Sequence, residues 1–138
     1  MSAAIPAIQK FMTYDPICIE WSKTVEDARH LMKNNNIRHL PVVKDKKVVG
    51  IISDRDIKAV LGSVGGNPEL LLVSDISVSS VYKVSPQTPL DEVAAEMASQ
   101  HIGSALIEDN HRLVGIFTRF DALKAIVDIC HQRHHPNV

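Results

Sequence analysis

Apolar residues in the first half of the chain change from the spacing typical of strands to that typical of helices and back. Residues 16–21 read as a short strand. Apolar residues at helical spacing follow at Val25, Ala28, Leu31 and Met32. Thr24 and Asp27 fit a capping box at the start of this helix, and three asparagines at residues 34–36 end it. The pattern predicts a strand followed by a helix.

A hairpin and a second helix are predicted next. Residues 40–43 and 48–52 are rich in β-branched side chains and flank a polar turn at residues 44–47. A helix is predicted over residues 53–61, with Gly62 placed to stop it.

The second half of the chain repeats this order. Residues 81–84 read as a strand, and the helix after it opens with Pro89 at its first position. Strands at residues 105–107 and 113–117 form the second hairpin, and the last helix begins at Thr118. Each half therefore has the order β-α-β-β-α.

The two halves are also alike in sequence. Residues 48–57 (VVGIISDRDI) match residues 113–122 (LVGIFTRFDA), and a constant offset of 65 residues aligns residues 12–61 with 77–126 without a gap. The predicted fold class is α/β (α+β), with tandem copies related by an internal pseudo-twofold axis and small sheets flanked by helices.

Domain boundaries follow from this repeat. We predict a first copy with the N-terminal lead and a linker at residues 1–66, and a second copy with the C-terminal tail at 67–138. The linker is the glycine-rich stretch 62–68, and residues 69–73 are expected to form a short helical turn. Because a unit of about 65 residues buries little apolar surface, we expect the copies to share one core.

Composition and charge narrow the functional classes. The chain has 138 residues, 45% of them hydrophobic and 22% charged, which is typical of a soluble globular domain. A net charge of −1 provides no basic field for nucleic acid, and Lys44, Lys46 and Lys47 are expected to be solvated in a turn. No secretion signal or apolar run of membrane-spanning length is present, so the expected location is the cytoplasm.

Neither a metal site nor a catalytic group is indicated. Cys18 and Cys130 are far apart and outside any C-x-x-C pattern. His131, His134 and His135 have metal-ligand spacing, but they lie just before Pro136, and we interpret this segment as a frayed tail. The chain also lacks a G-x-S-x-G motif or a suggestive Cys–His pair, so we do not expect an enzyme.

A hydroxyl and an acid recur at the junction between strand and helix in both copies. These pairs are Ser53 with Asp56 and Thr118 with Asp121. One interpretation is a capping box with Asp in place of Glu, which needs no ligand. The other is a nucleoside site, in which the Asp accepts two hydrogen bonds from the ribose diol. Phosphates would then be held by the guanidinium groups of Arg38, Arg55 or Arg119.

Three segments make a family resemblance specific. Residues 11–16 (FMTYDP), 37–43 (IRHLPVV) and 50–57 (GIISDRDI), in this order within a duplicated unit, resemble a CBS-domain pair, also called a Bateman module. The resemblance covers essentially the whole chain. It implies a stand-alone regulatory module with two clefts between the copies, each able to bind AMP, ADP, ATP or S-adenosylmethionine.

The resemblance also implies roles for individual residues. Asp56 and Asp121 would hold ribose hydroxyls, with Ser53 and Thr118 near the ribose or phosphate. Arg38 matches a position that holds phosphate in some members of the family. The segments that flank the base correspond to Thr13, Ile17 and Tyr82. No obligatory cofactor is implied, and the expected partners are a regulatory nucleotide, an unknown effector protein and a second copy, which would form a homodimeric disc of four CBS motifs.

Two departures from the family pattern predict unequal clefts. Gly103 stands where the first copy has Arg38, and residues 76–79 differ from residues 11–14. We expect the Asp56 side to suit a phosphorylated nucleotide better. The Asp121 side would depend on Arg119 or on charges from a neighbour.

Two alternatives to nucleotide sensing remain open. The module could act as a ligand-independent dimerisation or scaffolding unit. It could also regulate a redox or transport protein without a nucleotide as the physiological signal. A nucleotide that raises the melting temperature would favour sensing over both.

Overall fold

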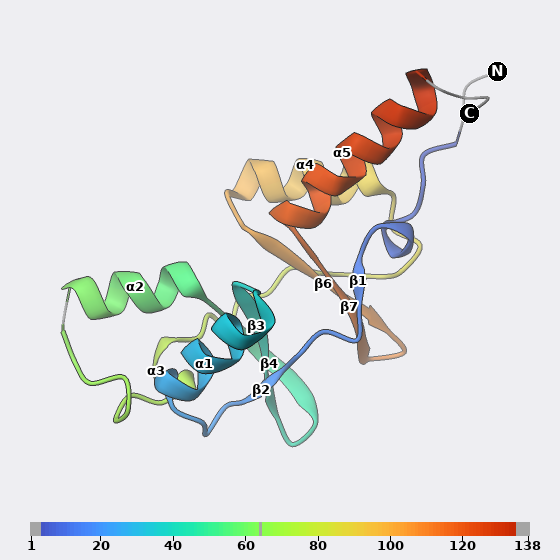
Figure 1. The fold of residues 1–138 in the computed structure, drawn as a ribbon. Coiled ribbons are helices and arrows are strands. Elements are labelled where there is room, and N and C mark those ends of the chain that lie inside the picture. The colour runs from blue at the N-terminus through green and yellow to red at the C-terminus, as the bar shows by residue number, and fades with distance from the viewer. Residues whose placement is uncertain (1–3, 64, 135–138) are drawn as a thin grey trace. The chain divides into compact units, whose positions relative to one another are not determined.

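The computed structural model describes residues 4–63 and 65–134, and it divides into two compact units (Figure 1). The terminal unit comprises Met1–Asp15 and Tyr82–Val138, and the middle unit comprises Pro16–Val81. These units do not coincide with the repeats at residues 1–66 and 67–138. The opening residues of each copy, 1–15 in the first and 67–81 in the second, are called its lead segment here, and each lead segment belongs to the unit that is otherwise formed by the other copy.

The middle unit is a three-stranded sheet with three helices (Figure 1). Its elements are β2 (Ile19–Glu20), α1 (Val25–Asn35), β3 (His39–Lys44), β4 (Lys47–Ser53), α2 (Asp54–Ser63) and α3 (Val73–Ile76). The strand order is β2-β3-β4, with β2 parallel to β3 and β3 antiparallel to β4.

The terminal unit repeats this plan and has one additional strand. Its elements are the 3-10 helix η1 (Ile8–Lys10), β1 (Thr13–Tyr14), β5 (Lys83–Val84), α4 (Leu90–Gln100), β6 (Ser104–Asp109), β7 (Arg112–Thr118) and α5 (Arg119–His134). The strand order is β1-β7-β6-β5, and β1 runs antiparallel to β7. The predicted class, mixed α/β with small sheets flanked by helices, is confirmed.

Local sequence accounts for the helix ends. The predicted capping box at α1 is present, since Thr24 Oγ1 accepts from Asp27 N and Thr24 N donates to the Asp27 carboxylate. Asn36 ends α1 in the left-handed region at φ 52°, which asparagine tolerates well. Three details differ from prediction. Gly62 lies inside α2, Pro89 is the N-cap of α4 and not its first residue, and the turn predicted over residues 69–73 lies at 68–70, ahead of the short helix α3 that begins at Val73.

Each unit has its own hydrophobic core, so the prediction of one shared core is wrong for the described residues. The core of the middle unit includes Leu40, Ile52 and Ile57, whereas that of the terminal unit includes Ile107 and Phe117. Each core nevertheless mixes the two copies, because Ile8 and Met12 of the first copy pack in the core of the terminal unit and Val73 of the second copy packs in that of the middle unit.

The exchanged segments explain the duplicated glycine. In the terminal unit, Thr13 of β1 pairs with Ile116 and Tyr14 with Gly115, and in the middle unit Val78 forms a bridge with Ile51 that corresponds to the first of these pairs. A Cβ added at Gly50 would lie 2.8 Å from the Val78 carbonyl oxygen, and one at Gly115 would overlap the Met12 side chain. Glycine at both positions therefore lets a lead segment approach the strand closely.

Candidate functional site

Asp121, in the first turn of α5, closes a complete capping box. Its Oδ2 accepts from Thr118 N at 2.9 Å and from Thr118 Oγ1 at 3.2 Å. Asp121 N donates in return to Thr118 Oγ1 at 3.4 Å. The residue is only 5% exposed. This carboxylate thus satisfies the helix N-terminus of α5.

The lead strand β1 supplies another partner for the same carboxylate. Thr13 Oγ1 donates to Asp121 Oδ1 at 3.1 Å, a contact between residues 108 positions apart. Both oxygens of Asp121 therefore accept hydrogen bonds from the protein. A ribose diol would have to replace the Thr13 hydroxyl to gain two hydrogen bonds here.

Asp56 occupies the corresponding position at the start of α2 but is bonded differently. Asp56 N donates to Ser53 Oγ at 3.1 Å, so half of the capping box forms. No described residue donates a hydrogen bond to the Asp56 carboxylate or forms an ion pair with it. The residue is half-buried. Its carboxylate oxygens are free to accept hydrogen bonds from a ligand.

The difference between the two acids has a sequence cause in the lead segments. The middle unit has Val78 at the position that Thr13 holds in the terminal unit, since Ile51 pairs with Val78 as Ile116 pairs with Thr13. Valine has no hydroxyl and cannot donate to Asp56.

The backbone of Arg38 lies near the start of α2, the helix that carries Asp56. Its carbonyl oxygen accepts from Asp54 N at 2.9 Å, which places the Arg38 backbone next to the first residue of α2. Gly103 makes the equivalent contact with Arg119 N at 3.3 Å in the terminal unit. Arg38, Arg55 and Arg119 are all exposed and form no ion pair with a described residue. The cationic side chain that the first copy adds at this junction is therefore missing in the second.

Ile17 and Tyr82 lie further from the acids in their own units. Ile17 precedes the edge strand β2, and Tyr82 precedes the edge strand β5. The strand register places each at the same end of its sheet as the hydroxyl residue of that unit, Ser53 or Thr118, but two strands away from it. Ile17 is exposed and Tyr82 packs against the core. Burial raises the pKa of the Tyr82 phenol, and Glu96 and Glu92 raise it further, so the group stays a protonated donor.

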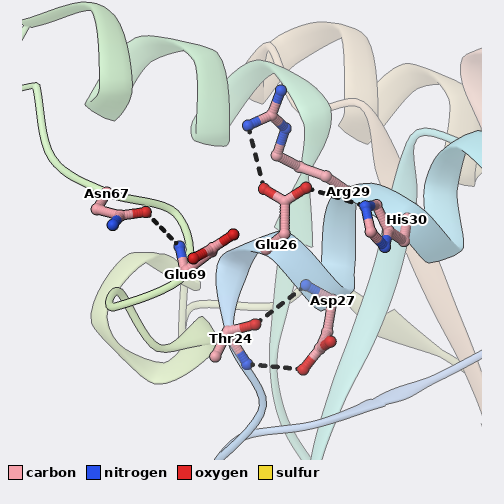
Figure 2. Close-up of polar contacts among 7 residues, drawn as sticks. All are labelled: Thr24, Glu26, Asp27, Arg29, His30, Asn67 and Glu69. Carbon is pink, nitrogen blue, oxygen red and sulfur yellow. Dashed lines mark hydrogen bonds and ion pairs between the residues drawn. The ribbon is translucent and has the colours of Figure 1, made fainter.

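The sequence reading missed a separate cavity of about 350 Å³ beside α1 in the middle unit. None of the predicted site residues lines it, and its walls include Cys18, Glu20, Asp27 and His30. Burial raises the pKa of the Cys18 thiol, and Glu20 adds to the shift. Figure 2 shows that polar groups at this helix contact one another, with Glu26 paired to Arg29 and to His30 Nε2 at 3.0 Å. These contacts lie along α1, and two of their residues, Asp27 and His30, also line the cavity.

The described residues contain neither a metal centre nor a membrane-spanning helix. They contain no group of three or more His, Cys, Asp or Glu that could hold a metal ion. Because α5 continues to His134, the frayed-tail interpretation is wrong for His131 and His134, while His135 lies outside the described residues. Within the same ranges, no helix is long and apolar enough to cross a membrane.

Known proteins share this fold and sequence pattern. The model of the CBS domain family matches residues 8–63 and 73–128. The CBS domain-containing protein YhcV of Bacillus subtilis is 27% identical over 94% of this chain and 99% of its own length. An inosine-5'-monophosphate dehydrogenase of Korarchaeum cryptofilum is 32% identical over 88% of this chain, which spans only 24% of that enzyme.

A solved structure gives the clearest ligand comparison. The CBS domain pair of protein MJ0100, crystallised with 5'-methylthioadenosine and S-adenosyl-L-methionine, is 26% identical to this chain. It superposes with a TM-score of 0.82 and covers 91% of this chain and 98% of the other.

Proposed function

The chain belongs to the CBS domain family, and we propose that it is a regulatory module that binds an adenosine-type ligand and signals to a partner protein. The adenosine part of the ligand is supported by the MJ0100 pair, which was crystallised with two adenosine derivatives. Its candidates are AMP, ADP, ATP and S-adenosylmethionine. A regulatory role without catalysis agrees with the dehydrogenase comparison, in which the matching region is a quarter of the enzyme.

The open carboxylate of Asp56 is the observation that carries this proposal. A carboxylate with no protein donor can accept one hydrogen bond from each hydroxyl of a ribose diol. A half-buried position strengthens those bonds relative to bulk water. We therefore assign the ribose to Asp56, with Ser53 beside it.

Unpaired arginines favour a phosphorylated ligand. Arg38 and Arg55 flank the junction that holds Asp56, and each guanidinium can donate two parallel hydrogen bonds to a phosphate. The sulfonium of S-adenosylmethionine is a cation that these side chains would repel. AMP, ADP or ATP is thus our first choice for the middle unit.

Signalling requires that the ligand bind two states of the protein with different affinities. We propose that the states differ in how the module, acting as a cytoplasmic homodimer, contacts an effector protein. A ligand-independent scaffold is the second candidate, and Asp121 supports it, since both oxygens of that carboxylate accept hydrogen bonds from the protein.

Calorimetric titration of AMP, ATP and S-adenosylmethionine tests the proposal. Asp56→Ala is expected to weaken binding of the true ligand by roughly 100-fold or more, because two hydrogen bonds to a charged group are lost and each is worth about 1.5–3 kcal/mol. Asp54→Ala is the matched control, since it removes the same charge two residues before Asp56. The Asp54 side chain is paired with Lys58 at 3.0 Å. Equal affinity in the two variants, or heat from none of the ligands, would leave the scaffold as the function.

A further inference from the structure

The cavity beside α1, called the α1 cavity below, lies apart from the junction that holds Asp56. Its walls come from β2 and the residues next to it and from one side of α1, at positions 27, 30, 31 and 34. β2 and β4 are the opposite edge strands of the middle sheet, and Asp56 follows β4. The volume of about 350 Å³ is within the range of small-molecule sites, about 300–1,000 Å³.

Charged side chains of both signs line the α1 cavity without pairing with one another. Lys23 lies three residues after Glu20 and four before Asp27, yet its ammonium forms no ion pair with a described residue. Within the same ranges, nothing donates a hydrogen bond to the Glu20 carboxylate. Asp27 uses only Oδ2, which accepts from Thr24 N (Figure 2). One ammonium and two carboxylates are therefore available to a ligand.

Other parts of the wall are less polar. Ile19 is buried and Leu31 is half-buried. The half-buried Cys18 thiol is neutral at physiological pH, since burial and Glu20 raise its pKa, and a neutral thiol packs as a small apolar group. His30 and Asn34 complete the lining. The α1 cavity thus combines free charges with an apolar wall.

The repeat supplies an internal control for these groups. At the matching positions, 65 residues later, the terminal unit has Lys83, Ser85, Thr88 and Glu92 in place of Cys18, Glu20, Lys23 and Asp27. Ser85 and Thr88 hydrogen-bond to each other, and Lys83 pairs with Glu108 at 3.5 Å, so these side chains have partners within the protein. The same strand and helix form without the ammonium of Lys23 or the carboxylate of Glu20. Neither charge is required by the fold of the repeat.

We propose that the α1 cavity binds a free α-amino acid with an apolar side chain. Lys23 pairs with the ligand carboxylate, and Glu20 and Asp27 accept hydrogen bonds from its ammonium. The ligand side chain packs against Ile19, Leu31 and Cys18. A neutral ligand would leave all three charges of the cavity without partners, and a phosphate would face two carboxylates and only one ammonium. A zwitterion matches both signs of charge.

This site goes beyond the proposed function in position and in ligand class. The amino acid and the nucleotide would occupy opposite edges of the middle sheet, so the module would receive two separate chemical signals. Amino-acid binding does not depend on nucleotide, so a failure of AMP to bind would leave the proposal intact.

Calorimetric titration of the nucleotide-free chain with L-leucine, L-methionine, L-valine and L-phenylalanine tests the ligand class. At least one is expected to bind at millimolar concentration. The amine and the carboxylic acid that each lack one charged group of the tightest binder should bind about 10-fold more weakly, because each loses a charge-assisted contact. No heat from any of the four amino acids, or an analogue that binds as tightly as its amino acid, would overturn the proposal.

A matched pair of lysine variants tests the assignment of the carboxylate. Lys23→Gln should weaken binding of the amino acid by about 10-fold and leave binding of the amine analogue unchanged. Lys33→Gln is the control, because it makes the same substitution at an exposed position of α1 that does not line the cavity. Circular dichroism shows that both variants keep the fold. Equal affinity of the two variants for the amino acid would contradict the role of Lys23.

Protection of Cys18 tests the location. In a Cys130→Ser background, a saturating amino acid should slow alkylation of Cys18 by iodoacetamide severalfold, because the bound side chain covers the thiol. Lys23→Gln in the same background should show less protection at the same amino-acid concentration. An unchanged alkylation rate at saturation would place the amino acid outside the α1 cavity and overturn the proposal.

Discussion

Asp56 and Asp121 hold the same position in two copies of one motif, yet one carboxylate is open and the other is fully bonded. Asp121 is buried and accepts from Thr13 and Thr118, whereas Asp56 accepts from no described residue. Part of the difference comes from the lead segments, which have threonine at 13 and valine at 78, and the rest from Ser53, which makes no counterpart to the two bonds that Thr118 donates to Asp121. A repeated motif can thus serve stability in one copy and be available to a ligand in the other.

The largest expected effect is on stability. Asp121→Ala removes a helix cap and leaves the Thr13 hydroxyl and Thr118 N without their acceptor, so we expect a loss of about 2–3 kcal/mol in the free energy of unfolding. Asp56→Ala should cost about 1 kcal/mol or less, since only half a box forms there. Urea unfolding of both variants measures the difference. Equal losses would show that the two acids play the same structural role.

A second effect concerns phosphate recognition in the middle unit. Arg38→Ala should weaken AMP binding by about 10-fold, in line with one charge-assisted contact, and leave adenosine binding unchanged. Arg119→Ala, in the terminal unit, is the control. Calorimetry with both ligands separates the outcomes, and a loss of adenosine affinity would mean that Arg38 acts on the fold and not on phosphate.

Thr13→Val places a valine in β1 of the terminal unit, at the position where the middle unit has Val78. Because it removes one hydrogen bond to a buried carboxylate, we expect about 1–2 kcal/mol of destabilisation. Thermal unfolding measures it. Tyr14→Val, at the next and exposed position of β1, should change stability less, and the reverse order would contradict the role of Thr13.

The smallest effect is on thiol reactivity in the middle unit. Because burial and Glu20 raise the pKa of Cys18, less of it is thiolate at neutral pH, and alkylation is slow and accelerates as pH rises towards that pKa. Glu20→Gln removes the smaller cause and should speed alkylation about twofold in a Cys130→Ser background. Iodoacetamide labelling followed by mass spectrometry gives the rates, and a slower variant would contradict the electrostatic cause.

Long periodic segments made much of the fold predictable. The α1 capping box, the asparagine end of α1 and both hairpins leave local signals that residue types alone reveal. The strand Thr13–Tyr14 leaves no such signal, because two residues show no period and its partner β7 lies about 100 positions away. The exchange of lead segments was missed for this reason.

The residues of the candidate sites could be predicted from the sequence, but their hydrogen-bond partners could not. Both hydroxyl and acid pairs were found. Alignment of the two copies also shows that Val78 replaces Thr13 and that Gly103 replaces Arg38. Thr13 belongs to the first copy along the chain, but its hydroxyl contacts Asp121 of the second copy. Only the pairing of the strands shows which acid a lead residue reaches.

Val78→Thr tests the central claim most directly, because it gives the middle unit the hydroxyl that occupies Asp121 in the terminal unit. Calorimetric titration of AMP into this variant is expected to show about 10-fold weaker binding than in the unmodified chain, since the new threonine competes with ribose for the Asp56 carboxylate. Val78→Ala, which adds no donor, should bind AMP as the unmodified chain does. Unchanged affinity in Val78→Thr would contradict the assignment of Asp56 as the open, ligand-binding acid.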